Sequence, residues 1–268
     1  MKKQITLLIL IAAFATQCGR VPITGRKQIN MLPEIFLTDM ALANYADFKS
    51  QNQIINNTSE SIMVKSVGNR MSSAVENYLI KKNQYKRIKN YQWEFNLAKD
   101  NVANAWCMPG GKVMIYTGIL PITKNETGLA VVMGHEIAHA VARHGNERMS
   151  QQIVLVMGGI GLAVALAEKP KETQDIFMLA YGVGATVGVL LPFSRLHEKE
   201  ADKMGLVFMA IAGYDPNEAI DFWKRMEQQG GANIPAFLST HPSHETRIKE
   251  LEEYMPVAEV YYNQYKKN

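Results

Sequence analysis

A five-residue run, His135-Glu136-Ile137-Ala138-His139, constrains the fold of this chain more than any other feature. The run lies inside a helical pattern that extends from Leu129 to Arg143. Residues four apart on a helix share one face, so the two imidazoles lie one turn apart and can bind one Zn²⁺ at about 2.0–2.1 Å. Glu136 projects about 100° further round the helix, near such a metal but not on it.

The position of Glu136 predicts the chemistry of this site. Zinc lowers the pKa of a water that it binds to about 7, and a nearby carboxylate can pass that proton to a leaving amine. At the ends of the helix, Thr123 and Glu126 have the spacing of a capping box, and Gly145 is expected to close the helix. A helix with two surface histidines is the alternative, and the apolar pattern of the flanking residues disfavours it.

A third protein ligand is needed, and its type separates classes of zinc protein. The metzincin pattern requires glycine at position 142 and histidine at position 145, and this chain has Ala142 and Gly145 instead, so that class is excluded. A carboxylate must then come from another helix. Glu198 and Asp202 are the best candidates, because residues four apart share a helix face. One can bind the metal while the other accepts the free ring N–H of a ligand histidine.

Two neighbouring residues are expected to lie outside the metal site. His144 points elsewhere on the helix and is interpreted as a packing or helix-end histidine. Glu200 lies on the opposite side of its helix from Glu198, so we expect it on a solvated, charged face. Two histidines and one carboxylate also suit iron, which leaves the identity of the metal open between zinc and iron.

The rest of the chain predicts a mostly helical α+β protein with one small sheet. Residues 91–97 and 113–116 resemble strands, and residues 63–79 repeat apolar side chains every four positions, as a helix does. Hydrophobic residues make up 47% of the chain and charged residues 20%, which excludes a generally disordered chain. The net charge of +4 gives no electrostatic reason to expect nucleic acid as a partner.

The N-terminus predicts export and a lipid anchor. Residues 1–17 combine a basic start with an apolar run of 11 residues, Ile5 to Ala15, which is typical of a signal peptide. The small residues before Cys18 resemble the lipobox of bacterial lipoproteins, in which the cysteine receives a diacylglyceryl group and becomes the new N-terminus. The alternative is a plain secretory signal with a coincidental cysteine. A lipidated Cys18 attaches the protein to a membrane by its acyl chains.

The residues after Cys18 divide into two parts. We expect a linker over residues 18–32 and a single folded domain over residues 33–268. Because lipidation removes Cys18 as a disulfide partner, Cys107 is predicted to be a lone, buried thiol.

Two charge-free apolar stretches, residues 153–167 and 176–193, have more than one possible placement. They contain 15 and 18 residues, and the second reaches the length of a candidate transmembrane helix. Because the first is shorter than a bilayer requires and the pair contains six glycines, we expect core helices that cover the active-site helix. The alternatives are a membrane hairpin and a membrane-facing patch on an anchored protein.

Four short motifs occur in order along the chain: Asn104–Val113, Gly134–Ala140, Ser194–Asp202, and Ser239–Ser243 followed by Arg247. Together they resemble the zinc metallopeptidases that include HtpX, BepA, the mitochondrial Oma-type proteases and the CAAX prenyl endopeptidases. The resemblance implies a zincin-like (gluzincin) domain with a small sheet beside the HExxH helix. The lipobox followed by Pro22-Ile23-Thr24-Gly25-Arg26 resembles the small bacterial lipoprotein branch of that family.

The resemblance also implies the roles of the metal-site residues. His135, His139 and Glu198 correspond to the ligands of one Zn²⁺ per chain. Glu136 corresponds to the general base and acid, and Asp202 to the partner of a ligand histidine.

Further positions match residues that contact the substrate in relatives. Asn104 and Ala105 lie where relatives present an edge strand to the substrate backbone, which main-chain hydrogen bonds then hold near the metal. His241 has two possible roles: it can donate a hydrogen bond to the oxyanion, or it can bind the open metal position and shut the enzyme off. Arg247 is expected to support that loop or to bind a substrate carboxylate, unless it forms only a surface salt bridge.

These features predict a zinc-dependent metalloendopeptidase of the bacterial cell envelope. It would be an outer-membrane lipoprotein that faces the periplasm and cleaves misfolded or stalled envelope proteins. A latent or chaperone-like assembly factor that uses the same cleft is the second interpretation, and the presence of Glu136 and all three ligands favours catalysis over it. The third is a polytopic protease of the HtpX type, with both apolar stretches in the membrane.

Overall fold

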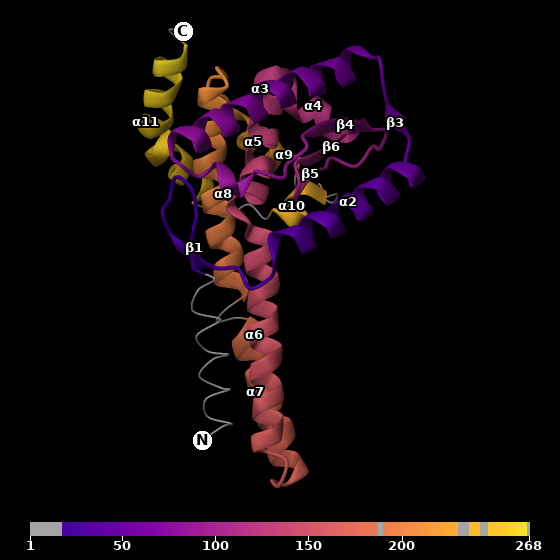
Figure 1. The fold of residues 1–268 in the computed structure, drawn as a ribbon, viewed down its shortest axis with the longest axis vertical. Helices are drawn as coiled ribbons and strands as arrows, with labels where there is room; N and C mark the ends of the chain where they lie inside the picture. The colour runs from indigo at the N-terminus through magenta and orange to yellow at the C-terminus, as the bar shows by residue number, and fades with distance from the viewer. Residues whose placement is uncertain (1–17, 187–189, 230–235, 242–245, 267–268) are drawn as a thin grey trace.

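Helices form most of the protein, around one small sheet. The computed structural model describes residues 18–186, 190–229, 236–241 and 246–266. A helical body encloses the sheet, and a long hairpin of two helices projects from the body (Figure 1). The predicted α+β, mostly helical class is confirmed. In chain order the elements are β1 (Cys18–Arg20), β2 (Lys27–Ile29), α2 (Glu34–Gln51), β3 (Ile54–Ile55), α3 (Ser59–Lys81), η1 (Tyr85–Arg87), β4 (Glu94–Ala98), β5 (Ala105–Met108), β6 (Lys112–Tyr116), η2 (Thr117–Ile119), α4 (Leu120–Thr123), α5 (Glu126–Ala142), α6 (His144–Ala165), α7 (Lys171–Ala185), α8 (Leu191–Ile211), α9 (Glu218–Gln228), α10 (Ala236–Thr240) and α11 (Arg247–Tyr265).

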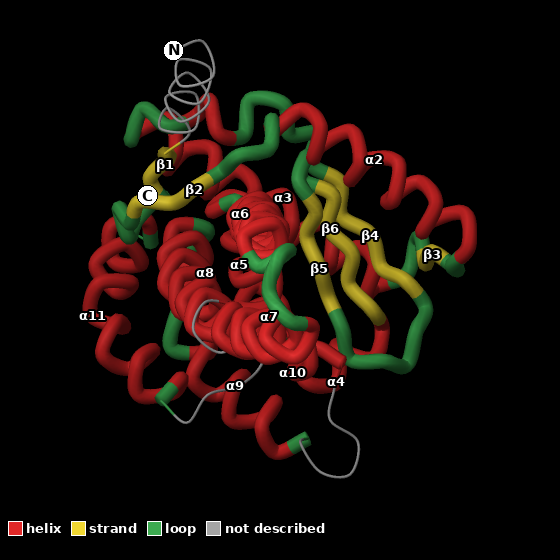
Figure 2. The backbone as a smooth tube through the Cα atoms, turned by 90° about the horizontal axis from the view of Figure 1, so that it is seen from below, coloured by secondary structure: helices red, strands yellow, loops and turns green. Residues whose placement is uncertain are grey.

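The main sheet has the strand order β3-β4-β6-β5, so β5 is an outer strand. Strands β4 and β6 are parallel, and the other two pairs are antiparallel. Alternate residues face opposite sides of the sheet. Phe95 and Val113 pack in the main core with α3 and α5, whereas Met114 packs with Tyr45 of α2 on the other face. Figure 2 shows α2 on one side of the sheet and α3 and α5 on the other.

The two strands predicted from the apolar pattern are present as β4 and β6. Strand β5 was expected only from the family resemblance of Asn104 and Ala105, because its residues Ala105–Met108 do not alternate in polarity. Its position at the edge of the sheet follows from its pairing with β6, in which Ala105 lies opposite Ile115.

Helices α5 and α8 pack closely because two glycines meet where they cross. A Cβ atom on Gly134 would lie 3.0 Å from the carbonyl oxygen of Gly205, and a Cβ on Gly205 would lie 3.0 Å from the backbone of Gly134. Such contacts are tighter than nearly all real Cβ contacts, so a larger residue at either position would force the two helices apart. The close approach brings the residue after Gly134, which is His135, next to the helix that carries Glu198.

Helix α5 does not begin and end where the sequence pattern predicts. The cap is Asn125, whose side chain accepts a hydrogen bond from the Gly128 amide, and Thr123 belongs to α4. The predicted capping box is therefore wrong by two residues. At the other end, Arg143 adopts a left-handed conformation with φ of 63°, and α6 begins at the next residue. Gly145 lies inside α6 and does not end the helix.

The segment expected to be a linker, residues 18–32, is instead packed on the body. Its strands β1 and β2 pair as a hairpin, and Val21 and Gln28 are buried. The Gln28 side chain donates a hydrogen bond to the carbonyl oxygen of Ala142, at the end of α5. Residues 1–17, the predicted signal peptide, lie outside the described residues.

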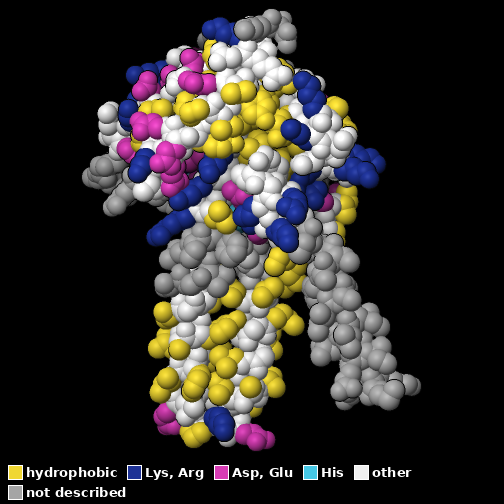
Figure 3. Space-filling view, turned by 90° about the vertical axis from the view of Figure 1, so that its left-hand side faces the viewer, with side chains coloured by type: hydrophobic (Ala, Val, Ile, Leu, Met, Phe, Trp, Pro, Cys, Tyr) yellow, Lys and Arg dark blue, Asp and Glu magenta, His cyan; other side chains and the backbone are white. Residues whose placement is uncertain are grey.

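The prediction that the two apolar stretches form core helices is wrong. The stretches lie mostly in α6 and α7, which form the projecting hairpin, and Tyr181 of α7 donates a hydrogen bond to the Leu155 carbonyl of α6. By length and composition, α6 could cross a membrane, and only 11% of its apolar window is buried. Figure 3 shows hydrophobic side chains over the visible face of the hairpin and charged side chains at its tip. The large apolar residues that are exposed on the described part of this hairpin are Ile153, Val154, Val156, Met157, Ile160, Val164, Ile176, Phe177, Met178, Leu179 and Val183.

Candidate metal centre

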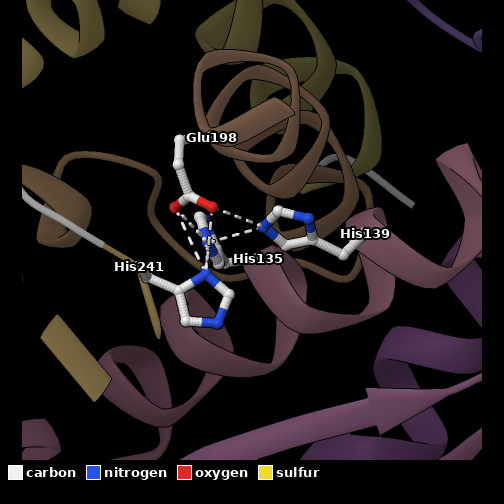
Figure 4. A group of neighbouring side chains, drawn as sticks. All are labelled: His135, His139, Glu198 and His241. Atoms are coloured by element: carbon white, nitrogen blue, oxygen red, sulfur yellow. Dashed lines mark hydrogen bonds and ion pairs between the residues drawn. The ribbon is translucent and has the colours of Figure 1, made fainter. Parts of the chain in front are cut away.

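Four side chains from three parts of the chain converge in the body of the protein (Figure 4). His135 and His139 come from α5, Glu198 comes from α8, and His241 directly follows α10. One ligand atom from each of the four lies within 4.8 Å of all the others. Two or three imidazoles with one carboxylate form a donor set that suits zinc, so the residues fit the metal implied by the sequence.

The two α5 histidines turn their Nε2 atoms toward Glu198, and His135 turns its other ring nitrogen toward Asp202. The Nε2 atoms of His135 and His139 lie 3.1 Å apart, and each is 3.3 Å from an oxygen of Glu198. On its other side, His135 Nδ1 lies 2.9 Å from Asp202 Oδ1. The structure thus brings together the three predicted ligands and places the predicted partner Asp202 behind one of them.

Burial and charge set the ionisation of this cluster. Burial opposes charge on His135, but hydrogen bonds to Asp202 and Glu198 outweigh it and raise its pKa to about 9. Burial likewise opposes ionisation of Asp202, yet the positive charge of Arg247 and the bond to His135 hold its pKa below the usual range. Burial is also the main reason why the pKa of Glu136 is raised. A carboxyl with a raised pKa is suited to accept and release a proton near neutral pH.

Glu136 lies in the wall of a pocket of about 320 Å³ that opens beside the four converging side chains. One of its oxygens is 3.3 Å from Nε2 of His241. The pocket is also lined by His139 and by residues 104–107, which include the outer strand β5. A polypeptide bound along β5 would therefore pass directly beside Glu136.

The backbone of β5 has hydrogen-bonding groups that point outward. The Tyr116 amide donates to the Asn104 carbonyl, so the backbone groups of the next residue, Ala105, face away from β6. The Ala105 N–H donates instead to the side chain of Asn104, over 2.9 Å. Asn104 thus occupies an edge position that a substrate carbonyl could take.

Cys107 is only half-buried and lines the same pocket. Desolvation and the nearby Glu136 raise the pKa of its thiol well above the usual value. The thiol is therefore protonated near neutral pH and is a poor nucleophile.

Arg247 does not line the pocket, which differs from the expected contact with a substrate carboxylate. Its side chain is completely buried, Nη2 donates to Asp202 Oδ1 over 2.7 Å, and the guanidinium lies 3.3 Å from the centre of the Trp223 ring. Arg247 supports the centre from behind. Ser243 and His244 of the fourth motif lie outside the described residues.

Two residues predicted to lie outside the metal site, His144 and Glu200, are buried close behind it. His144 is 1% exposed, and its Nδ1 is 2.9 Å from Nδ1 of His139. Glu200, predicted to be solvated, is 3% exposed and lies 3.3 Å from Nε2 of His144. Helical spacing alone places both residues away from the site. The left-handed turn at Arg143 and the packing of residues 18–32 change that, and no local sequence pattern predicts either.

The comparisons with known proteins agree with this geometry. The mitochondrial metalloendopeptidase OMA1 of Schizosaccharomyces pombe is 40% identical over 175 residues, which are 65% of this chain and 50% of that protein. The mitochondrial metalloendopeptidase OMA1 of Homo sapiens is 32% identical over 179 residues, 64% of this chain and 34% of that protein. A putative beta-barrel assembly-enhancing protease of Vibrio cholerae is 32% identical over 168 residues, 59% of this chain and 34% of that protein. The chain thus spans half or less of the length of these relatives.

The family model described as Peptidase family M48 matches residues 66–255 of this chain. These residues include α5, α8 and every side chain of the candidate centre. This range covers well over half of the chain and confirms the family resemblance seen in the four motifs. The chain belongs to peptidase family M48.

Proposed function

We propose that this protein is a zinc-dependent metalloendopeptidase that cleaves polypeptides in the bacterial cell envelope. The observation that carries the proposal is the convergence of His135, His139 and Glu198 beside Glu136, at the end of an open pocket with an edge strand along its wall. Two histidines, one carboxylate and an adjacent carboxylate that is not a ligand are the groups that metal-assisted peptide hydrolysis requires.

The side chains divide the work of hydrolysis between them. When bound by His135, His139 and Glu198, zinc would polarise the scissile carbonyl and lower the pKa of water to about 7. The Glu136 carboxylate then accepts a proton from the attacking water and delivers it to the leaving nitrogen. The outward-facing backbone of Ala105 binds the substrate chain as an added strand and fixes the scissile bond near Glu136.

We propose that His241 is a fourth ligand of the metal when no substrate is bound. Its Nδ1 lies 3.2 Å from His135 Nε2 and 3.1 Å from Glu198, which suits a fourth ligand. Four protein ligands are typical of closed zinc sites, whereas catalytic sites keep one position open. Substrate must therefore displace His241, whose N–H can then donate to the oxyanion.

Removal of the metal tests the proposed activity. Treatment of the purified protein with a chelator should stop cleavage of an unfolded protein, and one equivalent of zinc per chain should restore it. Metal analysis of the untreated protein should find zinc. Cleavage that survives complete metal removal contradicts the proposal, and iron in place of zinc contradicts the choice of metal. Zinc binding without cleavage favours the latent or chaperone-like assembly factor.

The bacterial envelope is favoured by the lipobox-like sequence at Cys18, which suits an outer-membrane lipoprotein that faces the periplasm. The relative named as a beta-barrel assembly-enhancing protease supports envelope proteins as substrates. Misfolded or stalled chains are the substrates that an edge strand can bind, because their backbones are extended and exposed.

The hairpin of α6 and α7 provides a second attachment to the membrane. The sequence of this region contains two charge-free runs of 19 residues, Met149–Ala167 and Ile176–Ser194. Each run has an arginine at the end nearer the body and an acidic residue at the tip. A helix of that length measures about 28 Å, which matches the roughly 30 Å hydrocarbon core of a bilayer. Helices that are apolar on every side are stable only in a protein core or in lipid.

Vesicle flotation tests this attachment on a chain that begins at Gly19 and lacks the lipid anchor. We expect it to float with phosphatidylethanolamine–phosphatidylglycerol vesicles and the double variant Val156→Lys, Leu179→Lys to remain unbound. Ile80→Lys is the control, since Ile80 is 55% exposed on α3 of the body. If the chain from Gly19 is soluble without detergent and does not float with the vesicles, the proposed membrane attachment by the hairpin is contradicted. Oligomers held together by the hairpin contradict it as well and identify a protein interface.

A further inference from the structure

The two histidines of the HExxH run are supported in parallel ways. His135 uses Nε2 toward the metal centre and passes Nδ1 to Asp202, which also accepts a hydrogen bond from Arg247. His139 likewise uses Nε2 toward the centre, and its Nδ1 faces His144. A ligand histidine commonly donates its second ring N–H to an acceptor, which fixes the tautomer and the ring plane.

A hydrogen bond between His139 and His144 requires one particular tautomer of each ring. If His139 binds the metal through Nε2, its Nδ1 carries a proton and needs an acceptor. Nδ1 of His144 lies 2.9 Å away and can accept this hydrogen bond only when it is not protonated. A neutral His144 then carries its proton on Nε2, which lies 3.3 Å from Glu200 Oε2 and can donate to it.

Glu200 is held in turn by the N-terminal segment. Its Oε2 accepts hydrogen bonds from Nε and Nη2 of Arg26 over 2.9 and 2.7 Å, and its Oε1 accepts one from the Thr24 hydroxyl over 2.7 Å. Arg26 also forms two hydrogen bonds to Glu147, of 2.7 and 2.6 Å. Thr24 and Arg26 belong to the motif Pro22–Arg26, to which the proposed catalytic mechanism assigns no role.

We propose that His144, Glu200 and Arg26 form a hydrogen-bonded relay that positions the metal ligand His139, so that residues 24–26 support the metal centre from outside the matched family range. The relay rests on the proposed role of His139 as a ligand. It parallels the pair Asp202 and Arg247 behind His135, with one additional imidazole inserted between the ligand and the carboxylate.

Zinc affinity, measured by competition with a chromophoric chelator, tests the relay without any need for cleavage. We expect His144→Ala, Glu200→Gln and Arg26→Gln to weaken zinc binding by about 10–100-fold, the usual cost of removing a partner of a ligand histidine. His197→Gln is the matched control. His197 stacks on His144 with ring centres 4.3 Å apart and bonds to Glu147, whereas the ring that faces Nδ1 of His139 is that of His144. Lys27→Gln is the control for Arg26.

The outcomes separate the relay from the proposed function. Wild-type zinc affinity in folded His144→Ala or Glu200→Gln overturns the relay and leaves the peptidase proposal intact. An equal loss in His197→Gln assigns the effect to general packing and also overturns it. A wild-type protein that binds no zinc overturns both proposals.

Nitrogen NMR of the zinc-loaded protein gives a second test that needs no variant. The relay requires a proton on Nδ1 of His139 and on Nε2 of His144, with Nδ1 of His144 unprotonated. A His144 ring protonated on Nδ1 overturns the relay, because that ring has no acceptor to offer His139. This measurement stays informative even if the substituted proteins do not fold.

Discussion

Replacement of Glu136 by glutamine is expected to lower kcat/KM for an unfolded protein by about 10²–10⁴-fold, the range typical for loss of a general base. Glutamine keeps the shape of the side chain but cannot accept a proton. Zinc binding should remain at one ion per chain, because Glu136 lies outside the group of four converging ligand atoms. The assay compares cleavage and zinc content of the two proteins.

The matched control for this substitution is Glu126→Gln, on the same helix α5. Glu126 lies in the first turn, and its side chain is 49% exposed in a weak 3.8 Å ion pair with Arg70. We expect cleavage by this variant to equal that of the wild type. Undiminished cleavage by Glu136→Gln contradicts the assigned role, and loss of zinc from that variant shows that Glu136 contributes to the metal site itself.

A third outcome concerns His241. If the wild type and Glu136→Gln both bind zinc and neither cleaves, the site is latent. His241→Ala should then release activity, because it removes the side chain that lies 3.3 Å from Glu136 and among the ligands. If the wild type does cleave and His241→Ala lowers that cleavage, the main contribution of His241 is to stabilise the oxyanion.

The sequence predicts the parts of this centre that follow from helical periodicity. The spacing of His135 and His139 places both rings on one face of α5, and the spacing of Glu198 and Asp202 does the same on α8. All four side chains meet as these patterns indicate. Periodicity is reliable here because the helix geometry alone fixes which side chains are neighbours.

The sequence does not predict contacts that depend on a turn or on distant segments. His144 is one such case, since it meets His139 only because the chain turns at Arg143. Glu200 is another, because the partner that buries it is Arg26, 174 residues away in a segment that looks like a linker. Apolar composition misleads for residues 153–167, because composition alone does not distinguish a buried helix from the exposed hairpin helix that these residues form.

Replacement of Arg247 by methionine is expected to destabilise the metal-free protein by about 3–5 kcal/mol, the cost of removing one partner of a buried ion pair. The guanidinium is 0% exposed, forms a 2.7 Å ion pair with Asp202 and stacks on Trp223. Denaturant unfolding in the presence of a chelator measures the change. Lys249→Met on the same helix is the control. The Lys249 side chain is 74% exposed, so this variant should differ from the wild type by less than about 0.5 kcal/mol.

The pH dependence of this deficit identifies its origin as the Asp202 charge. Burial opposes ionisation of Asp202, and Arg247 outweighs it and lowers its pKa. A lowered pKa gives stability above the pKa of the unfolded chain that is lost as the pH falls through the folded pKa. The advantage of the wild type over Arg247→Met should therefore be full at pH 7 and shrink in acid, where Asp202 is protonated in the variant. When Asp202 is already replaced by asparagine, Arg247→Met should cost much less stability. The double variant should therefore lose less unfolding free energy than the sum of the two single changes. A deficit that is constant with pH and strictly additive assigns the loss to packing on Trp223 alone.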